Sequence, residues 1–169
     1  RTGNLLPGVE REGNAYLVKI QKGAVAPAIP AQSGNDKSMI VFSGDLDKAI
    51  AALIIANGAA SMGRKVTMFF TFWGLNILRK NERVSVKKNF IEKMFGRMMP
   101  RGSEKLGLSR MNMLGMGPKM IRSVMKSKNV TSLEDLLRSA IDSGVRIVAC
   151  QMSMDIMGIK PEELIDGVE

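Results

Sequence analysis

Short apolar runs alternate with longer amphipathic stretches through most of this chain. Over residues 38–169, the runs SMIVFSG, KVTMFFTF and VRIVA are rich in β-branched and aromatic residues and predict buried strands. Helical spacing of apolar residues predicts helices in DLDKAIAALIIANGAASMG and TSLEDLLRSAIDSG, and the start of another in WGLNILRK. Strands that alternate with helices predict an α/β fold with a mostly parallel sheet covered on both faces.

Capping residues mark the ends of two of these helices. Asp45 is placed to cap the first helix or to lie in its first turn, and Gly63 ends that helix. Thr131 or Ser132, followed by acidic residues at 134 and 135, resembles a capping box, and Gly144 ends the helix that follows.

The first 37 residues follow another pattern. A polar turn at 10–14 precedes a strand in which Tyr16, Val18 and Ile20 keep a mostly two-residue period. Residues 23–37, GAVAPAIPAQSGNDK, are rich in Ala, Pro and Gly and predict a linker. We therefore expect three parts: a docked β arm or the end of another domain (1–22), a linker (23–37) and an α/β domain (38–169).

Composition limits the possible chemistry. The chain of 169 residues is 45% hydrophobic, enough for one ordinary core, and it holds one cysteine and no histidine. These counts exclude an internal disulfide, multi-cysteine metal sites, Ser–His and Cys–His catalytic pairs and imidazole ligands. We therefore expect no metal and no cofactor. The longest apolar run, 49–56, is too short for a membrane span, and a lone thiol fits a reducing cytoplasm.

The net charge of +9 is concentrated in one segment, 79–105, which supplies +6 of it. This segment indicates an acidic partner or an anionic ligand, unless it is simply a solvated helical face. Nucleic acid is not expected, because Phe90 and Phe95 are its only aromatic residues. The basic residues of the charged segment are Arg79, Lys80, Arg83, Lys87, Lys88, Lys93, Arg97, Arg101 and Lys105, against Glu82, Glu92 and Glu104.

The methionines of the middle segment indicate either core packing or an adaptable interface or lid.

The only cysteine, Cys150, follows the last predicted strand. Ligands of parallel sheets bind beyond the carboxyl ends of the strands, so this position is one where function is expected. If SMDIMG begins a helix, the amides at its start lower the pKa of the thiol. Cys150 is then either a reactive thiolate or an inert buried filler. Gln151, Met152 and Ser153 of the same loop are candidates for its surroundings.

Two other loops leave strand ends. The amides of Ser43-Gly44-Asp45 could hold an anion, but the loop lacks the GxGxxG and P-loop patterns and equally fits a tight turn with an Asp cap. Asp45 and Asp47 could bind a metal, although carboxylates near a helix start are usually caps. Trp73, at the end of the second strand, could form the wall of a pocket beside Cys150 or simply pack.

Much of the chain resembles one known family. MIVFSGDLDKAIAALIIANGAASMGRKVTMFFTFWGLNILRK and VRIVACQMSMDIMGIKPEELIDGVE resemble the DsrE/DsrF-like family of sulfur-relay proteins. More narrowly, they are similar to the branch fused to rhodanese and TusA-like domains in pyridine nucleotide–disulfide oxidoreductases. The resemblance covers nearly all of 38–169 and implies a flavodoxin-like three-layer α/β sandwich, homo-oligomers, and a cysteine that carries sulfane sulfur as a persulfide. By position that cysteine is Cys150.

The opening TGNLL…EREGNAYLVKIQKG resembles the final β-hairpin of a TusA-like domain. The cysteine–proline site that such a domain uses would lie before Arg1. The resemblance therefore implies that 1–22 is a remnant of that domain and that the chain is a piece of a longer fusion.

The leading hypothesis is a sulfurtransferase or sulfur carrier, whose donors and acceptors would be TusA-like or rhodanese domains or small thiols such as coenzyme A. Thiol exchange at sulfur needs no general base, which agrees with the absence of histidine. The alternatives are a non-catalytic nucleotide- or anion-binding module, in which Cys150 only packs, and a scaffold subunit of a sulfur relay.

Overall fold

The computed structural model describes residues 9–12, 15–18, 34 and 36–169, which fall in two units, Arg1–Gly34 and Asn35–Glu169. In the first unit, β1 (Val9–Glu12) pairs antiparallel with β2 (Ala15–Val18). The predicted strand is thus present over 15–18, and Ile20 lies outside the described residues. Residues 10–12 belong to β1, so the polar turn predicted at 10–14 is wrong there: charged residues also pair across a hairpin, with Glu10 opposite Leu17.

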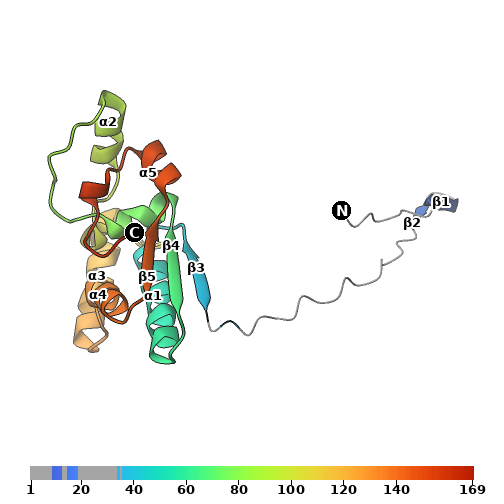
Figure 1. The fold of residues 1–169 in the computed structure, drawn as a ribbon, viewed down its shortest axis with the longest axis horizontal. Helices are drawn as coiled ribbons and strands as arrows, with labels where there is room; N and C mark the ends of the chain where they lie inside the picture. Colours follow the sequence, from blue (N-terminus) through green and yellow to red (C-terminus); the bar gives the residue numbers. More distant parts are fainter. Residues whose placement is uncertain (1–8, 13–14, 19–33, 35) are drawn as a thin grey trace. The chain divides into compact units, whose positions relative to one another are not determined.

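A parallel sheet forms the centre of the second unit (Figure 1). Its order is β3 (Lys37–Val41), β4 (Val66–Phe70) and β5 (Arg146–Ala149), as the three apolar runs predict. The residues at the carboxyl end of the chain continue the sheet beside β5. Val168 pairs in parallel with Ile147, and the Glu169 N–H donates to the Ile147 carbonyl at 2.8 Å. Most of the predicted linker, 23–37, lies outside the described residues, and Lys37 already belongs to β3.

One face of this sheet is covered by α1 (Leu46–Ser61) and α4 (Leu133–Asp142), which contact each other. Right-handed crossovers between strands in the order β3-β4-β5 step in one direction and therefore place both connecting helices on the same face. Met68, Phe70 and Ile147 from the sheet pack into the core with apolar residues of both helices. The predicted α/β fold with a parallel sheet is confirmed.

The opposite face is less covered. Ile40, Phe69 and Val148 are neighbours in the strand register and so share this face. Ile40 is 69% exposed, and Phe42, which follows β3 in the same alternation, is 65% exposed. We call this surface, made by Ile40, Phe42, Phe69 and Val148, the open sheet face.

The connection from β4 to α4 is irregular. The helix expected from WGLNILRK is instead a 3₁₀ helix, η1 (Phe72–Leu78). Its residues 74–78 are all buried and only its first two residues, Phe72 and Trp73, are exposed, so it lacks the solvated stripe of the amphipathic α-helix that the pattern suggested. The connection continues with α2 (Phe90–Met98), η2 (Ser103–Lys105), η3 (Met113–Gly115) and α3 (Met116–Ser127). Leu114 and Gly115, the last two residues of η3, have positive φ angles and so break the helical backbone just before α3.

The predicted helix ends are largely confirmed. The Ser132 hydroxyl accepts the Asp135 N–H at 3.1 Å at the start of α4, and Gly63 and Gly144 have positive φ angles after α1 and α4. Asp45 is the N-cap residue of α1 but its carboxylate makes no capping bond; it accepts from Ser43 and from Lys48 instead.

After β5, the chain forms α5 (Gln151–Met157) and a short turn, η4 (Pro161–Glu163). Helix α5 contacts η1 and α2. Among the helices that the structure describes, none combines the length and the apolar character that crossing a bilayer requires.

Candidate functional site

Cys150 lies between the end of β5 and the start of α5, where it is the N-cap residue. Its backbone N–H donates to the Phe70 carbonyl at the end of β4 at 2.9 Å, and its carbonyl accepts the Met154 N–H at 3.0 Å. These bonds fix the residue at the carboxyl edge of the sheet, where Cys150 is a free cysteine and a partly exposed residue. The thiol is therefore held by the strand end and the helix start together.

Polar groups surround the sulfur. Hydrogen bonds from the Ser153 hydroxyl and from the Ser153 N–H lower the pKa of the Cys150 thiol, against the opposing effect of burial. The Thr71 hydroxyl and the Met152 N–H lower the pKa further. Ser153 itself is buried, and its hydroxyl lies 2.7 Å from that of Thr71. A thiol stabilised as the thiolate in this way is a nucleophile towards sulfur and carbon electrophiles.

The other residues of the cysteine loop point elsewhere. Gln151 and Met152 are both exposed, and the Gln151 amide donates to Asp155 one turn along α5 at 2.9 Å. Of the three neighbours named from the sequence, Ser153 contributes its side chain to the sulfur and Met152 its backbone. Thr71 was missed as an individual residue, although its loop was expected at this edge because it follows β4.

A second region of the same edge is a cavity of about 690 Å³. Its lining includes Ser43, Gly44, Asp45 and Trp73, so the structure brings the first two predicted loops together. Cys150 is not among the residues that line this cavity. Trp73, which is 55% exposed, thus forms a wall with the first loop rather than beside the thiol.

Glycines allow these two loops to approach each other. A Cβ atom on Gly44 would lie 2.7 Å from the Trp73 carbonyl oxygen, and one on Gly74 would lie 2.1 Å from that of Val41. Some of the backbone N–H groups expected to hold an anion already donate to groups within the protein. The Asp45 N–H donates to the Ser43 hydroxyl at 3.3 Å, and the next one along the chain, from Leu46, donates to a carbonyl of another loop.

Asp47, the other acidic residue considered for a metal, has a structural role. Its carboxylate accepts from the Ser109 N–H at 3.0 Å and from the Ser109 hydroxyl at 2.6 Å. Burial alone would raise the pKa of Asp47, but the bonds from Ser109 outweigh it and lower the pKa. Asp47 therefore fastens the loop that contains Ser109 to the first turn of α1.

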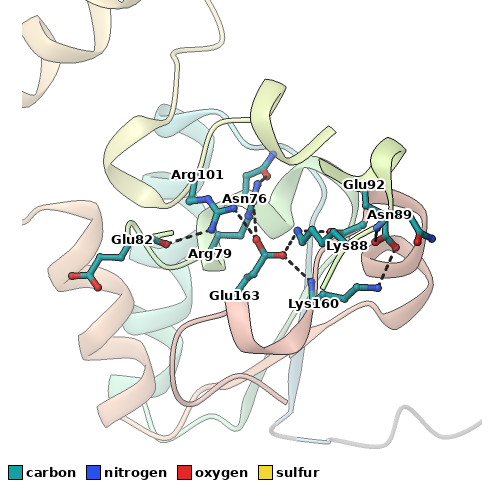
Figure 2. A network of polar contacts seen from close by, with 10 residues as sticks. Asn76, Arg79, Glu82, Lys88, Asn89, Glu92, Arg101, Lys160 and Glu163 are labelled. Carbon is teal, nitrogen blue, oxygen red and sulfur yellow. Dashed lines mark hydrogen bonds and ion pairs between the residues drawn. The ribbon is translucent and has the colours of Figure 1, made fainter. Parts of the chain in front are cut away.

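A group of buried and partly buried charges surrounds Glu163, as Figure 2 shows in detail. One carboxylate oxygen of Glu163 accepts from Arg79 at 3.2 Å and from Arg101 at 2.8 Å. The other accepts from the Lys88 ammonium and from the Lys160 N–H. We call Glu163, Arg79, Lys88 and Arg101 the Glu163 cluster.

Burial alone would raise the pKa of Glu163. Bonds from Lys88 and from the Lys160 backbone, together with the charges of Lys88 and Arg79, outweigh burial and lower the pKa. Glu163 is therefore a fixed negative charge at the centre of three cations. Only one sequence signal pointed to this cluster, the excess of basic residues at 79–105, and it did not indicate which acidic residue would pair with them.

Comparison with known proteins assigns most of the chain. The profile of the DsrE/DsrF/DrsH-like family matches residues 34–169. The uncharacterized protein YrkE of Bacillus subtilis is 57% identical over 132 residues, which cover 78% of this chain and 82% of that protein. The sulfur carrier protein DsrE2 of Allochromatium vinosum is 38% identical over 136 residues, with 78% and 84% covered. The uncharacterized protein MJ0760 of Methanocaldococcus jannaschii is 24% identical over 171 residues, covering 99% of this chain and 48% of that protein.

Proposed function

This chain belongs to the DsrE/DsrF/DrsH-like family, whose fold is flavodoxin-like, and we propose that it is a sulfur-relay protein that carries sulfane sulfur as a persulfide on Cys150. The observation that carries the proposal is the partly exposed free cysteine at the carboxyl edge of the sheet, whose thiol pKa is lowered by Ser153 and Thr71. The similarity of this chain to a sulfur carrier protein, to which it is 38% identical, supports the same class of function.

The chemistry consists of two exchanges at sulfur. The Cys150 thiolate attacks the outer sulfur of a donor persulfide, R–S–SH. A new S–S bond forms to Cys150 while the S–S bond of the donor breaks, and R–S⁻ leaves with the electron pair. In the second exchange, an acceptor thiolate attacks the outer sulfur of Cys150–S–SH and releases the Cys150 thiolate. No external oxidant or reductant is consumed, and no histidine is required as a base.

Ser153 and Thr71 have a defined role in this scheme. Their hydroxyls lie beside the sulfur and beside each other, so they stabilise the thiolate both when it attacks and when it leaves. A lower thiolate pKa increases the attacking fraction at neutral pH and also makes Cys150 a better leaving group in the second exchange.

The partners follow from this chemistry. Donors and acceptors would be small sulfur-relay domains, TusA-like or rhodanese, or low-molecular-weight thiols such as coenzyme A.

Residues 1–22 would be the remnant of a TusA-like domain, and residues 23–37 a linker to the α/β domain at 38–169. A thiol that must remain reduced between transfers is suited to the cytoplasm.

We also propose that the protein is a homo-oligomer and that the open sheet face takes part in the contact. Parallel sheets are usually covered on both faces, whereas Ile40 and Phe42 are mostly exposed in the single chain.

The test is a mass measurement on the intact protein. The protein is incubated with a rhodanese charged with thiosulfate, or with a small persulfide, and compared with Cys150→Ser. Transfer predicts an increment of about 32 Da, one sulfur atom, on the wild type and none on the variant. A later incubation with an acceptor thiol should remove the increment. A wild type that stays unmodified while the donor remains active would leave only the scaffold or binding-module alternative.

One observation favours a second candidate function, a module that binds a nucleotide or another anion. The cavity of about 690 Å³ is lined by the exposed ring of Trp73 together with Lys105, Lys119 and Arg122. An aromatic wall with cations close by suits a ligand that has both a ring and a negative charge. In that case Cys150→Ser would leave ligand binding unchanged and Trp73→Ala would weaken it.

A further inference from the structure

A separate basic cavity of about 360 Å³ lies at α2 and the segment that leads into it. Among its lining residues, five are basic: Arg83, Lys88, Lys93, Arg97 and Arg101. The single acidic lining residue is Glu163. Arg83, Lys93 and Arg97 are exposed and form the rim, whereas Lys88 and Arg101 are partly buried. This cavity is distinct from the one beside Trp73 and does not include Cys150.

Glu163 can offset only one of the positive charges of this lining. Arg79, Lys88 and Arg101 all bind this one carboxylate, so three positive charges meet one negative charge and an excess of two remains. The side chains concerned are 0%, 7% and 14% exposed respectively, so water screens them incompletely. Glu92, the acidic residue of α2, is engaged by Lys160 at 3.1 Å. The rim residues add three further positive charges.

Excess positive charge in a partly buried site is unfavourable unless an anion offsets it. Guanidinium groups bind phosphate oxygens through paired N–H groups, and ammonium groups bind them as point charges, so a mixed set of arginines and lysines suits phosphate in particular. The volume is at the lower end of the range for small-molecule pockets, which favours a compact ligand over a protein surface.

We propose that this cavity binds a small phosphate-bearing molecule, with Arg83, Lys93 and Arg97 holding it from the rim and Lys88 and Arg101 from the inside. The site lies at the far end of α5 from the thiol. Lys88 donates to the Gly158 carbonyl, at the C-cap, at 2.7 Å, whereas Cys150 is the N-cap. The seven residues of α5 rise by roughly 10 Å. The inference therefore does not depend on the persulfide chemistry of Cys150.

The probe is inorganic pyrophosphate, titrated into the 169-residue protein by calorimetry at constant ionic strength. The wild type should bind one pyrophosphate per chain, and the ligand should raise the thermal midpoint through linkage. The variant Lys93→Gln/Arg97→Gln removes two exposed rim charges without touching the Glu163 cluster. Its affinity should fall by roughly tenfold or more, because charge-assisted hydrogen bonds are lost.

The matched control is Lys65→Gln/Arg110→Gln, which removes one lysine and one arginine that are exposed and do not line the cavity. It should keep the wild-type affinity. Equal weakening in both double variants would show non-specific charge attraction and overturn the proposal, as would the absence of saturable binding. Binding of an oligoglutamate peptide but not of pyrophosphate would also overturn it, in favour of an acidic protein partner. Cys150→Ser should bind pyrophosphate like the wild type, so this result and the sulfur-transfer result fail or succeed separately.

Discussion

The hydroxyl oxygens of Thr71 and Ser153 lie 2.7 Å apart, although 82 positions separate the two residues along the chain. This contact joins the loop after β4 to the first turn of α5, next to the only cysteine. Both hydroxyls lower the pKa of the Cys150 thiol, and the Ser153 hydroxyl has the larger effect. The arrangement therefore couples the position of a strand end to the reactivity of a neighbouring sulfur.

Replacing Ser153 by alanine should make Cys150 less reactive at neutral pH. The change removes the strongest hydrogen bond to the thiolate, so the pKa of Cys150 should rise and the thiolate fraction at pH 7 should fall. We expect alkylation by iodoacetamide at pH 7 to slow by roughly three- to tenfold, from the net strength of a typical hydrogen bond in a protein. The measurement is the alkylation rate as a function of pH.

Thr71→Val should produce a smaller change in the same direction. Ser61→Ala, at the exposed end of α1, is the matched control and should leave the profile unchanged. If Ser153→Ala reacts as fast as the wild type over the whole pH range, the thiolate is not stabilised in the way described here.

Gly74→Ala should be strongly destabilising. Its Cβ would lie 2.1 Å from the Val41 carbonyl oxygen, and that oxygen is held in place by the Thr71 N–H at 3.0 Å. Because the added Cβ can be accommodated only if the backbone at Val41 or Gly74 moves, we expect the free energy of unfolding to fall by about 2 kcal/mol or more. Urea denaturation measures this loss. Gly58→Ala is the control: its Cβ meets nothing within 4 Å inside α1, so it should stabilise by about 0.5–1 kcal/mol. Similar effects of the two substitutions would contradict this account of the loop.

Glu163→Gln should destabilise the protein in a manner that depends on pH. Removing the carboxylate leaves Arg79, Lys88 and Arg101 without their shared partner, at a cost of about 3–5 kcal/mol near neutral pH. The folded-state pKa of Glu163 lies below the ordinary 4.5, so its contribution is present above pH 4.5 and is lost as the pH falls through the lower folded value. The difference between wild type and variant should therefore shrink below pH 4.5.

Urea denaturation between pH 7 and pH 3 measures that difference. Glu162→Gln, an exposed neighbour in the same turn, should have little effect at any pH. A difference that stays constant down to pH 3 would mean that the lost stability does not come from the ionised carboxylate.

Polar substitutions on the open sheet face should reduce self-association. Ile40→Thr/Phe42→Ser removes two exposed apolar side chains and leaves the buried face of the sheet intact. Sedimentation velocity should show a smaller species than for the wild type. Ile54→Ser/Ile55→Thr, which changes exposed apolar residues on α1, serves as the comparison. An unchanged sedimentation coefficient for the sheet variant would remove this face from the interface.

Much of the fold could be predicted because the local signals agree with one another. The apolar periodicity is clear in the three strands and in α1 and α4, so these elements could be predicted. The place of Cys150 follows from the rule that ligands bind beyond the carboxyl ends of parallel strands. The prediction of an α-helix from WGLNILRK was wrong because apolar periodicity does not separate a largely buried 3₁₀ helix from the beginning of an amphipathic α-helix. Arg79, the basic residue that follows η1, is buried although its charge alone would favour a solvated position.

The Glu163 cluster could not be predicted in the same way. Its members are 62 to 84 positions apart from Glu163, so no local pattern connects them. Their meeting depends on how η1, α2 and the turn η4 pack at the tertiary level. The charge count showed that segment 79–105 has fewer acidic than basic residues. Only the folded chain shows that one distant carboxylate, that of Glu163, pairs with three cations.

The solitary thiol has a kinetic consequence. If Cys150 carries sulfur as proposed, no second cysteine within these 169 residues can take it over, so unloading to a separate acceptor is a second-order encounter with a sulfhydryl from outside this stretch. The discharge rate should then scale with acceptor concentration and depend on collision geometry at the sheet edge, rather than level off at an internal resolving step.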